Sequence, residues 1–170
     1  MEATFRTAVA ADVPAIRALV ESAYRGDSAR GGWTHEADLL GGERTSEAEV
    51  AAVVADPAQR IVIAEQDGRI VGSVAITSRP RARCYLGMLA VAPALQAAGL
   101  GRRLIAAAEE EARRSFGAAV MEMTVIHLRP ELIAYYERRG YARTGEIRPF
   151  PYDLPEAPGL QMVVLERPLG

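Results

Sequence analysis

The feature that most constrains the fold is a glycine-rich turn between an apolar strand and a long helix. Residues 83–91 form an apolar run, the sequence Gln-Ala-Ala-Gly-Leu-Gly follows at 96–101, and residues 100–116 carry apolar side chains at helical spacing. A further apolar run at 118–127 completes a strand–helix–strand unit. The first N–H groups of a helix lack partners within it, and the helix dipole makes them an anion site suited to a phosphate.

Two common phosphate-binding motifs do not fit this turn. A P-loop ends in Gly-Lys-Ser or Gly-Lys-Thr, whereas Gly101 is followed by Arg102 and Arg103. A dinucleotide fingerprint needs a third glycine three residues after Gly101, where this chain has Leu104. A third interpretation of the turn is therefore required.

The rest of the chain predicts one α+β domain, of mixed α/β character, around a single sheet. Strands are expected at residues 3–9, 60–66, 69–78, 141–147 and 160–166, and helices at 12–24, 46–55 and 130–139. Asp67-Gly68 predicts a hairpin turn, and Ser46 with Glu49 predicts a capping box at a helix start. Asp12 is expected to cap the first helix.

Length and composition narrow the classes of function. The chain has 170 residues, of which 49% are hydrophobic and 25% charged, as expected for a single globular domain over residues 1–170. Twenty basic and 22 acidic residues give a net charge of −2, without the basic excess typical of nucleic-acid binding. No apolar run is long enough to span a membrane. The single cysteine, Cys84, offers no disulfide or metal spacing, which favours a cytoplasmic protein without a metal.

Two motifs together resemble the acetyl-CoA signature of the GNAT superfamily of N-acetyltransferases. The first is Gln-x-x-Gly-x-Gly at 96–101, after a strand that ends in Leu-Ala-Val-Ala-Pro at 89–93. The second is a helix with Tyr136 four residues before the pair Gly140-Tyr141. The motifs stand in the family's order with a strand between them, and the order of elements across nearly the whole chain also fits.

The resemblance implies a mostly antiparallel sheet, flanked by about four helices, in which strands 83–91 and 118–127 are parallel and splay apart. Acetyl-CoA would be the co-substrate, with its pantetheine in the gap between these strands and its pyrophosphate on the glycine turn. Backbone N–H groups of Leu89 and Val91 would polarise the thioester carbonyl. Arg129 stands where many members have an asparagine that contacts CoA. The implied CoA-binding residues are Leu89, Ala90, Val91, Gln96, Ala97, Ala98, Gly99, Leu100, Gly101, Arg102, Arg129 and Tyr136.

The implied chemistry is direct attack of a neutral amine on the acetyl carbonyl. Tyr136 matches the family's tyrosine near the sulfur and is the candidate general acid, although its spacing from Leu132 also suits a core aromatic. Many members carry a glutamate in strand 83–91 where this chain has Tyr85. Either a water chain or a carboxylate from elsewhere would then remove the proton. Glu122 is the candidate carboxylate, and an exposed strand residue is its alternative role.

The acceptor often lies, in this superfamily, against the segment between the first two helices. Here Trp33, Glu36 and Asp38 are candidate contacts for a cationic amine, with Tyr85 from the strand. The alternative is that Trp33 fills the core while the two acids face water. The proline-containing loop at 148–153 is a candidate rim of the same cleft.

A primary amine of a small molecule is the favoured acceptor, because the sequence has no long charged recognition tract. A protein N-terminus or lysine is the second enzymatic interpretation. A non-catalytic acyl-CoA-binding sensor is a third, since the family's strand glutamate is missing. Edge strands leave a homodimer open.

Overall fold

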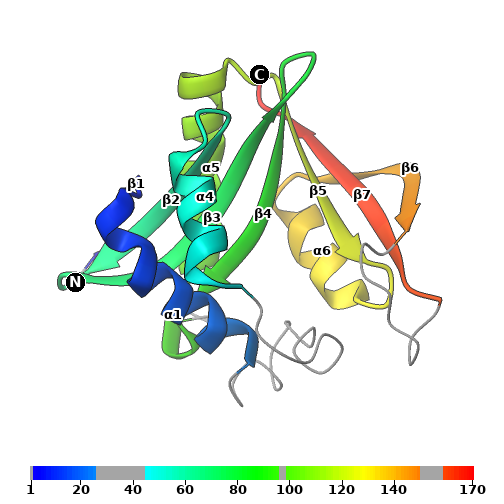
Figure 1. Cartoon of the computed structure of the whole chain (residues 1–170). Coiled ribbons are helices and arrows are strands. Elements are labelled where there is room, and N and C mark those ends of the chain that lie inside the picture. Colours follow the sequence, from blue (N-terminus) through cyan, green and yellow to red (C-terminus); the bar gives the residue numbers. More distant parts are fainter. Residues whose placement is uncertain (1, 26–44, 96–98, 150–158) are drawn as a thin grey trace.

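The computed structural model describes residues 2–25, 45–95, 99–149 and 159–170, which form a seven-stranded sheet with helices on both faces (Figure 1). The strands are β1 (Thr4–Thr7), β2 (Gln59–Gln66), β3 (Arg69–Arg79), β4 (Arg83–Val91), β5 (Val120–Ile126), β6 (Ala142–Pro149) and β7 (Gln161–Pro168). The helices of the described part are α1 (Val13–Arg25), α4 (Glu47–Ala55), α5 (Leu100–Phe116) and α6 (Pro130–Arg138), with 3-10 turns at Ala10–Asp12 and Pro93–Leu95. Every predicted element is present, and the α+β class is confirmed.

The strand order is β1-β2-β3-β4-β5-β7-β6, and every neighbouring pair is antiparallel except β4 with β5. The hairpin between β2 and β3 turns at Asp67 and Gly68, whose φ angles of 54° and 75° are those of the predicted two-residue turn. Helix α5 makes the crossover that a parallel pair requires. The mostly antiparallel sheet with one parallel pair is therefore confirmed.

The parallel ladder is short. Arg83 pairs with Val120, Cys84 with Met121, and Tyr85 with Glu122. Beyond these three pairs, β4 continues to Val91 and β5 to Ile126 without pairing with each other. Figure 1 shows the two strands starting side by side and diverging toward their carboxyl ends. The expected splay is confirmed.

A β-bulge interrupts β4 in the part that has left β5. The register with β3 shifts between Ser73 and Ala75, and Met88 opposite them has a φ of 52°. Leu86 and Leu89 belong to one core cluster, whereas Met88 packs against the other. A bulge inserts one residue and turns the neighbouring backbone groups away from their regular direction.

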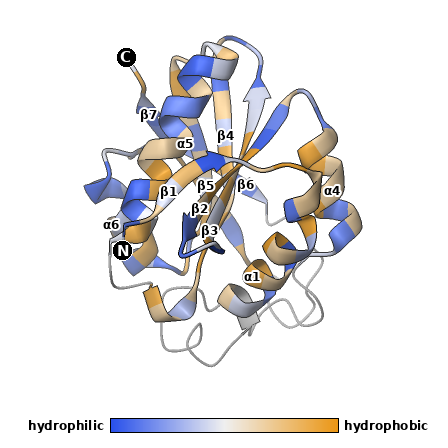
Figure 2. Ribbon diagram, turned by 90° about the vertical axis from the view of Figure 1, so that its left-hand side faces the viewer, coloured by the Kyte–Doolittle hydropathy of each residue, from blue (hydrophilic) through white to orange (hydrophobic). Residues whose placement is uncertain are grey.

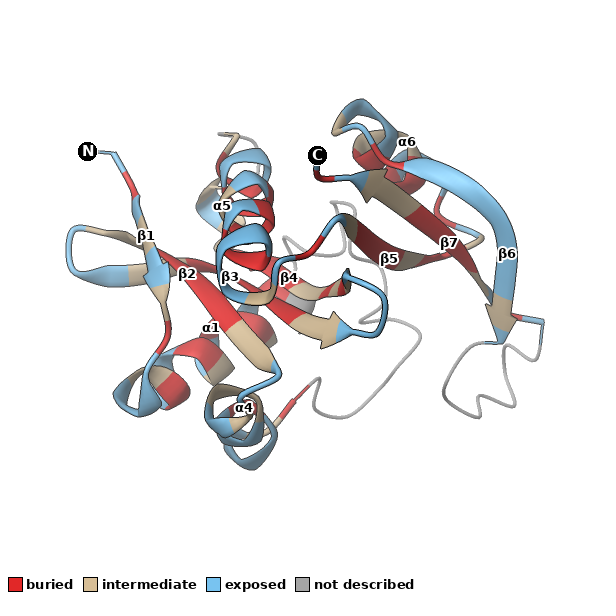
Figure 3. Ribbon diagram, turned by 90° about the horizontal axis from the view of Figure 1, so that it is seen from above, coloured by how far each residue is buried: buried red, intermediate tan, exposed pale blue. Residues whose placement is uncertain are grey.

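Two hydrophobic clusters hold the helices on opposite faces of the sheet. Figure 3 shows α5 and α6 on one face and α1 and α4 on the other, and Figure 2 shows apolar positions concentrated on the central strands. The α5–α6 cluster includes Leu104, Met121 and Ile133, and the α1–α4 cluster includes Ile16 and Val50. The helix faces predicted from apolar spacing are thus the faces that are buried.

A buried polar network ties α5 to the C-terminal strands. The Tyr141 hydroxyl donates to Glu109 Oε2 at 2.8 Å, and Arg167 Nη1 donates to Glu109 Oε1 at 2.7 Å. Burial, and then the charge of Glu109, raise the pKa of Tyr141. Gly140 has a φ of 99°, and a Cβ there would meet Arg167 Nε at 3.0 Å. The Gly140-Tyr141 pair therefore has a packing role in this fold.

The helix starts are capped in two different ways. Ser46 accepts the N–H of Glu49 at 3.1 Å, which is one half of the predicted capping box, whereas the Glu49 carboxylate accepts the Thr45 hydroxyl at 3.3 Å. Asp12 does not cap α1 directly: it ends the preceding 3-10 turn, accepts the N–H of Val9 at 2.8 Å and pairs with Arg6 at 2.8 Å. The expectation for Asp12 was wrong because a short turn, with its own unpaired N–H groups, comes before the helix. No helix in the described ranges has the length and apolarity needed to cross a membrane.

Candidate active site

Helix α5 begins at the predicted glycine turn. Its N-cap, Gly99, has φ 78° and ψ 7°, a left-handed conformation that favours glycine. Leu100 and Gly101 follow in the first turn and are buried. The other predicted members of the turn, Gln96, Ala97 and Ala98, lie outside the described residues. The described half is thus the N-terminus of a 17-residue helix, whose first N–H groups point away from the helix.

The two arginines in the first turn of α5 have different surroundings. Arg103 donates from Nη2 to the Ala3 carbonyl at 3.3 Å, and its guanidinium lies 5.2 Å from the Phe5 ring centroid. Arg102 has no hydrogen-bond or ion-pair partner among the described residues. Its Nη2 would lie 3.8 Å from a Cβ placed on Gly99. Arg102 therefore holds a positive charge beside the turn, whereas Arg103 contacts β1 and the segment before it.

Tyr85, a predicted acceptor contact, lies at the last pair of the parallel ladder. Its hydroxyl is 2.7 Å from Thr124 Oγ1 of β5, and the Arg79 guanidinium lies 5.0 Å from its ring centroid. A Cβ on Gly87 would be 3.1 Å from the Tyr85 ring, so the glycine makes room for the aromatic side chain. Sequence reasoning missed Thr124, whose signal was its spacing of two residues from Glu122 on the same strand face.

Glu122 lies opposite Tyr85 in the ladder and is buried between two arginines. Arg83 Nη2 approaches its Oε1 at 3.2 Å, and Arg148 Nη1 approaches its Oε2 at 3.0 Å. Burial alone would raise the pKa of Glu122, but the hydrogen bonds from Arg148 and Arg83 outweigh it, and the pKa lies below its usual value. Glu122 is therefore not the exposed strand residue of the alternative interpretation, and as a proton acceptor it is weakened by its ion pairs.

Tyr136 lies on the buried face of α6, with Leu132 and Ile133. Its ring packs edge-on against Tyr135 and Tyr141, with centroid distances of 5.4 and 6.3 Å. The same core cluster contains the predicted cofactor contacts Leu89, Val91 and Leu100. Ala90 belongs to the cluster on the opposite face. The packing role considered for Tyr136 is thus present, and its role as general acid stays a prediction.

Arg129, the N-cap of α6, is 4% exposed. Its Nε donates to Glu131 Oε1 at 2.9 Å, while both Nη atoms are buried with no hydrogen-bond partner among the described residues. Buried polar side chains nearly always have partners. Arg129 is therefore an exception among the buried polar side chains of the described residues.

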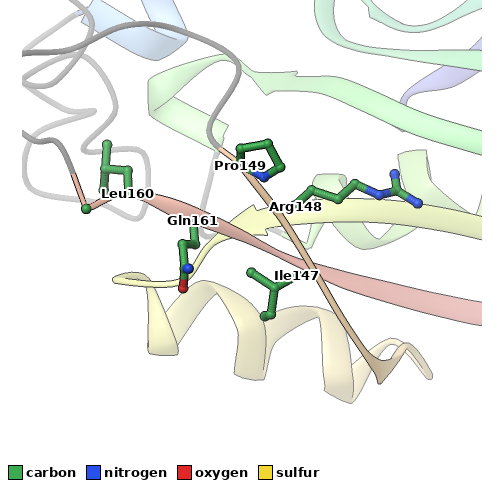
Figure 4. A pocket seen from close by; sticks show the side chains of 6 residues that line it. Ile147, Arg148, Pro149, Leu160 and Gln161 are labelled. Atoms are coloured by element: carbon green, nitrogen blue, oxygen red, sulfur yellow. The ribbon is translucent and has the colours of Figure 1, made fainter.

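A pocket of about 450 Å³ lies where β6 ends and β7 begins. It is lined by Ile147, Arg148, Pro149, Gly159, Leu160 and Gln161 (Figure 4). Figure 4 shows Arg148 extending away from Ile147 and Gln161, and its guanidinium reaches Glu122. Arg148 therefore links this end of the sheet to the polar face at Tyr85 and Glu122.

Three predicted acceptor contacts, Trp33, Glu36 and Asp38, lie outside the described residues, as does most of the loop predicted at 148–153. No cluster of potential metal ligands occurs in the part of the chain that the structure describes. Tyr85 is therefore the one predicted acceptor contact among the described residues, and it lies opposite Glu122 in the parallel ladder.

Comparison with models of protein families assigns the chain to a family. A model of the acetyltransferase (GNAT) family matches residues 15–141. The chain belongs to the GNAT acetyltransferase family. The protein is accordingly an acyltransferase of the N-acetyltransferase type, and its family uses acetyl-CoA as co-substrate. No curated protein matches the sequence.

Solved GNAT structures share this fold over nearly the full chain. The ribosomal-protein-S18-alanine N-acetyltransferase from Escherichia coli has a TM-score of 0.75 and 20% identity, covering 99% of this chain and 94% of its own. A chimera of the Vibrio cholerae spermidine N-acetyltransferase has a TM-score of 0.73 and 15% identity, covering 99% of this chain and 96% of its own. Nourseothricin acetyltransferase has a TM-score of 0.69 and 24% identity, covering 100% of both chains. At these identities the likeness shows the fold alone.

The described residues fit acetyl-CoA. Among the described residues, only the Arg102 guanidinium lies within 4 Å of a Cβ placed on Gly99. Positive charge at Arg102 and the α5 N-terminus suits the pyrophosphate. The separation of β4 from β5 after Tyr85 and Glu122 suits a thin chain such as pantetheine, which carries amide groups.

Proposed function

We propose that this GNAT enzyme transfers an acetyl group from acetyl-CoA directly to a primary amine of a small molecule. The observation that carries the proposal is the three-pair parallel ladder, after which β4 and β5 separate beside the left-handed Gly99 turn. We infer that the thioester of acetyl-CoA lies between the separated strands and that the phosphates of CoA lie at the turn.

Acetyl-CoA supplies the thioester and the thiolate leaving group. On the protein side, backbone N–H groups of Leu89 and Val91 are proposed to donate to the developing oxyanion. Support comes from the bulge at Met88, because it changes the backbone direction immediately before Leu89. Donors fixed in advance stabilise charge without reorganising during the reaction.

Tyr136 is proposed to hold a proton for the departing thiolate. It lies in the same core cluster as Leu89 and Val91, on the buried face of α6. A phenolic O–H is a suitable donor to a thiolate, and its burial keeps water away from the transfer.

Proton removal from the amine is proposed to involve water at the polar face of Tyr85, Thr124 and Glu122. The ion pairs of Glu122 lower its pKa, which favours an orienting role over direct proton abstraction. Glu122 as the base itself is the second candidate, and the pH dependence of kcat/KM distinguishes the two roles.

The deciding experiment measures CoA release from acetyl-CoA with a panel of polyamines, amino acids, aminoglycosides and peptides. Cys84→Ser serves as a control, although burial raises the Cys84 pKa to about 11 and disfavours its thiolate. Release that depends on a small amine supports the proposal. Release only with peptides would replace it with a protein acetyltransferase, and acetyl-CoA binding without any release would favour a sensor.

The acid is tested separately with Tyr136→Phe. We expect kcat to fall by about 10²-fold or more, the range of general acid catalysis, with acetyl-CoA affinity retained. Tyr135→Phe is the matched control, since the Tyr135 ring packs edge-on against Tyr136 and its centroid lies 4.9 Å from the Arg139 guanidinium. Equal effects of the two substitutions would remove Tyr136 as the acid.

A further inference from the structure

Arg129 is the only described residue that has buried side-chain nitrogen or oxygen atoms without a hydrogen-bond partner. Both of its Nη atoms are in this state. A guanidinium carries five N–H donors, and the bond from Nε to Glu131 uses one of them. Four donors of a permanently charged group thus lie in a buried position without acceptors.

Glu131 does not complete the pairing of this charge. Its side chain is 54% exposed, whereas that of Arg129 is 5% exposed. A carboxylate that stays in contact with water is screened and balances a buried charge only weakly. The environment of Arg129 therefore still favours an anion.

The position of Arg129 relates it to the splayed strands. It follows the carboxyl end of β5, where β4 and β5 have separated, and precedes the first turn of α6. The N-terminal end of a helix adds further positive potential. Leu132 and Tyr136, further along the helix, are buried in the cluster that contains Leu89 and Val91 of β4.

We propose that the two Nη atoms of Arg129 bind a carboxylate carried by one of the two substrates, either the acyl group of the donor or the amine acceptor. A carboxylate accepts two parallel N–H···O bonds from a guanidinium and neutralises its charge. A neutral amide carbonyl accepts hydrogen bonds but leaves the buried charge uncompensated. The inference rests on the proposed function, because that function brings both substrates to the splayed ends of the strands.

The first experiment tests the acyl donor: the full-length protein is titrated with CoA, acetyl-CoA and succinyl-CoA by calorimetry. If the carboxylate is on the acyl group, succinyl-CoA binds about tenfold more tightly than acetyl-CoA. Arg129→Gln abolishes that advantage, so that succinyl-CoA and acetyl-CoA then bind with equal affinity. Arg129→Lys keeps the charge without the fork of donors and retains only part of the advantage.

The second experiment tests the amine acceptor: acetyl transfer from acetyl-CoA is measured to free amino acids and to the corresponding amino acid amides. If the carboxylate is on the acceptor, the amides have a KM about tenfold higher than the acids in the wild type. In Arg129→Gln the two KM values converge. Arg138→Gln, which removes an exposed charge from the same helix, changes neither ratio.

Two results would overturn the inference. If Arg129→Gln weakens the binding of CoA, acetyl-CoA and succinyl-CoA equally, Arg129 contacts the CoA part that all three ligands share. The inference would also fall if acetyl transfer is intact but Arg129→Gln changes neither the preference for succinyl-CoA over acetyl-CoA nor the preference for amino acids over their amides. Failure of the proposed function is distinguishable, because the wild type and Arg138→Gln would then transfer no acetyl group to any small amine, while the calorimetric titrations of CoA, acetyl-CoA and succinyl-CoA would still report on Arg129.

Discussion

The hydroxyl of Tyr85 and Oγ1 of Thr124 lie 2.7 Å apart, across the point where β4 and β5 stop pairing. Tyr85 belongs to the last backbone pair of the parallel ladder, and Thr124 lies two residues beyond its partner Glu122. A side-chain hydrogen bond therefore joins the strands just after the backbone bonds end. This contact ties the two strands together at the start of the splay.

Tyr85→Phe is expected to destabilise the protein by about 1 kcal/mol, the net value of a typical hydrogen bond. Thr124→Val should cost a similar amount, measured as the free energy of unfolding in urea. In the double variant the loss should be smaller than the sum, because both substitutions remove the same bond. Strictly additive losses would mean that the contact contributes nothing to stability.

Gly99→Val is expected to weaken CoA binding by at least about tenfold, because a side chain at a left-handed N-cap blocks close approach of the pyrophosphate. Gly117→Val is a matched control at the other end of α5. Gly117 has a φ of 60°, close to the 78° of Gly99, and a Cβ there meets nothing within 4 Å. Both variants should lose similar stability, about 1–2 kcal/mol, but only Gly99→Val should lose CoA affinity, measured by calorimetry. Equal CoA affinities would exclude the turn as the phosphate site.

Local signals were enough to predict the elements of the sheet and helices. The hairpin at Asp67-Gly68 and the cap at Ser46 depend on residues next to each other in the sequence, and the structure has both. The splay of β4 and β5 followed from the family resemblance, because the apolar runs themselves do not show where pairing ends. The bulge at Met88 was not predicted, since a methionine with positive φ carries no turn signal.

The electrostatic character of the site depends on contacts that are distant in sequence. Glu122 is held by Arg83, 39 residues earlier, and by Arg148, 26 residues later. Strand pairing brings these residues together, and single-sequence reasoning gives no register for such pairs. Burial of Arg129 without partners for its Nη atoms is likewise a property of tertiary packing.

Arg102→Gln is expected to raise the Kd for CoA about three- to tenfold, with a smaller effect at high salt, because an exposed charge on a phosphate is screened. Arg103→Gln is the control in the same helical turn. Because Arg103 contacts Ala3 and Phe5, its loss should lower stability and leave CoA affinity nearly unchanged. Equal losses of affinity in the two variants would contradict this division of roles.

Glu122→Gln is expected to destabilise the protein by about 1–3 kcal/mol at pH 7, because it leaves Arg83 and Arg148 without their shared buried carboxylate. Glu146→Gln is the control. Glu146 also contacts Arg148, at 2.7 Å, but its side chain is exposed, and exposed ion pairs contribute little. Unfolding in urea measures both variants, and equal losses would contradict the assignment of Glu122 as the buried partner.

The contribution of Glu122 has a defined pH dependence. Since its pKa in the folded protein lies below the usual 4.5, its stabilisation is present above that pH and is lost as the pH falls through the folded-state pKa. The stability difference between wild type and Glu122→Gln should therefore be constant at neutral pH and shrink in acid below pH 4.5. The same ionisation bears on catalysis, measured as kcat/KM against pH. If Glu122 only orients water, the acid limb near neutrality persists in Glu122→Gln, whereas its disappearance would identify Glu122 as the base and require a raised pKa that its two arginines oppose.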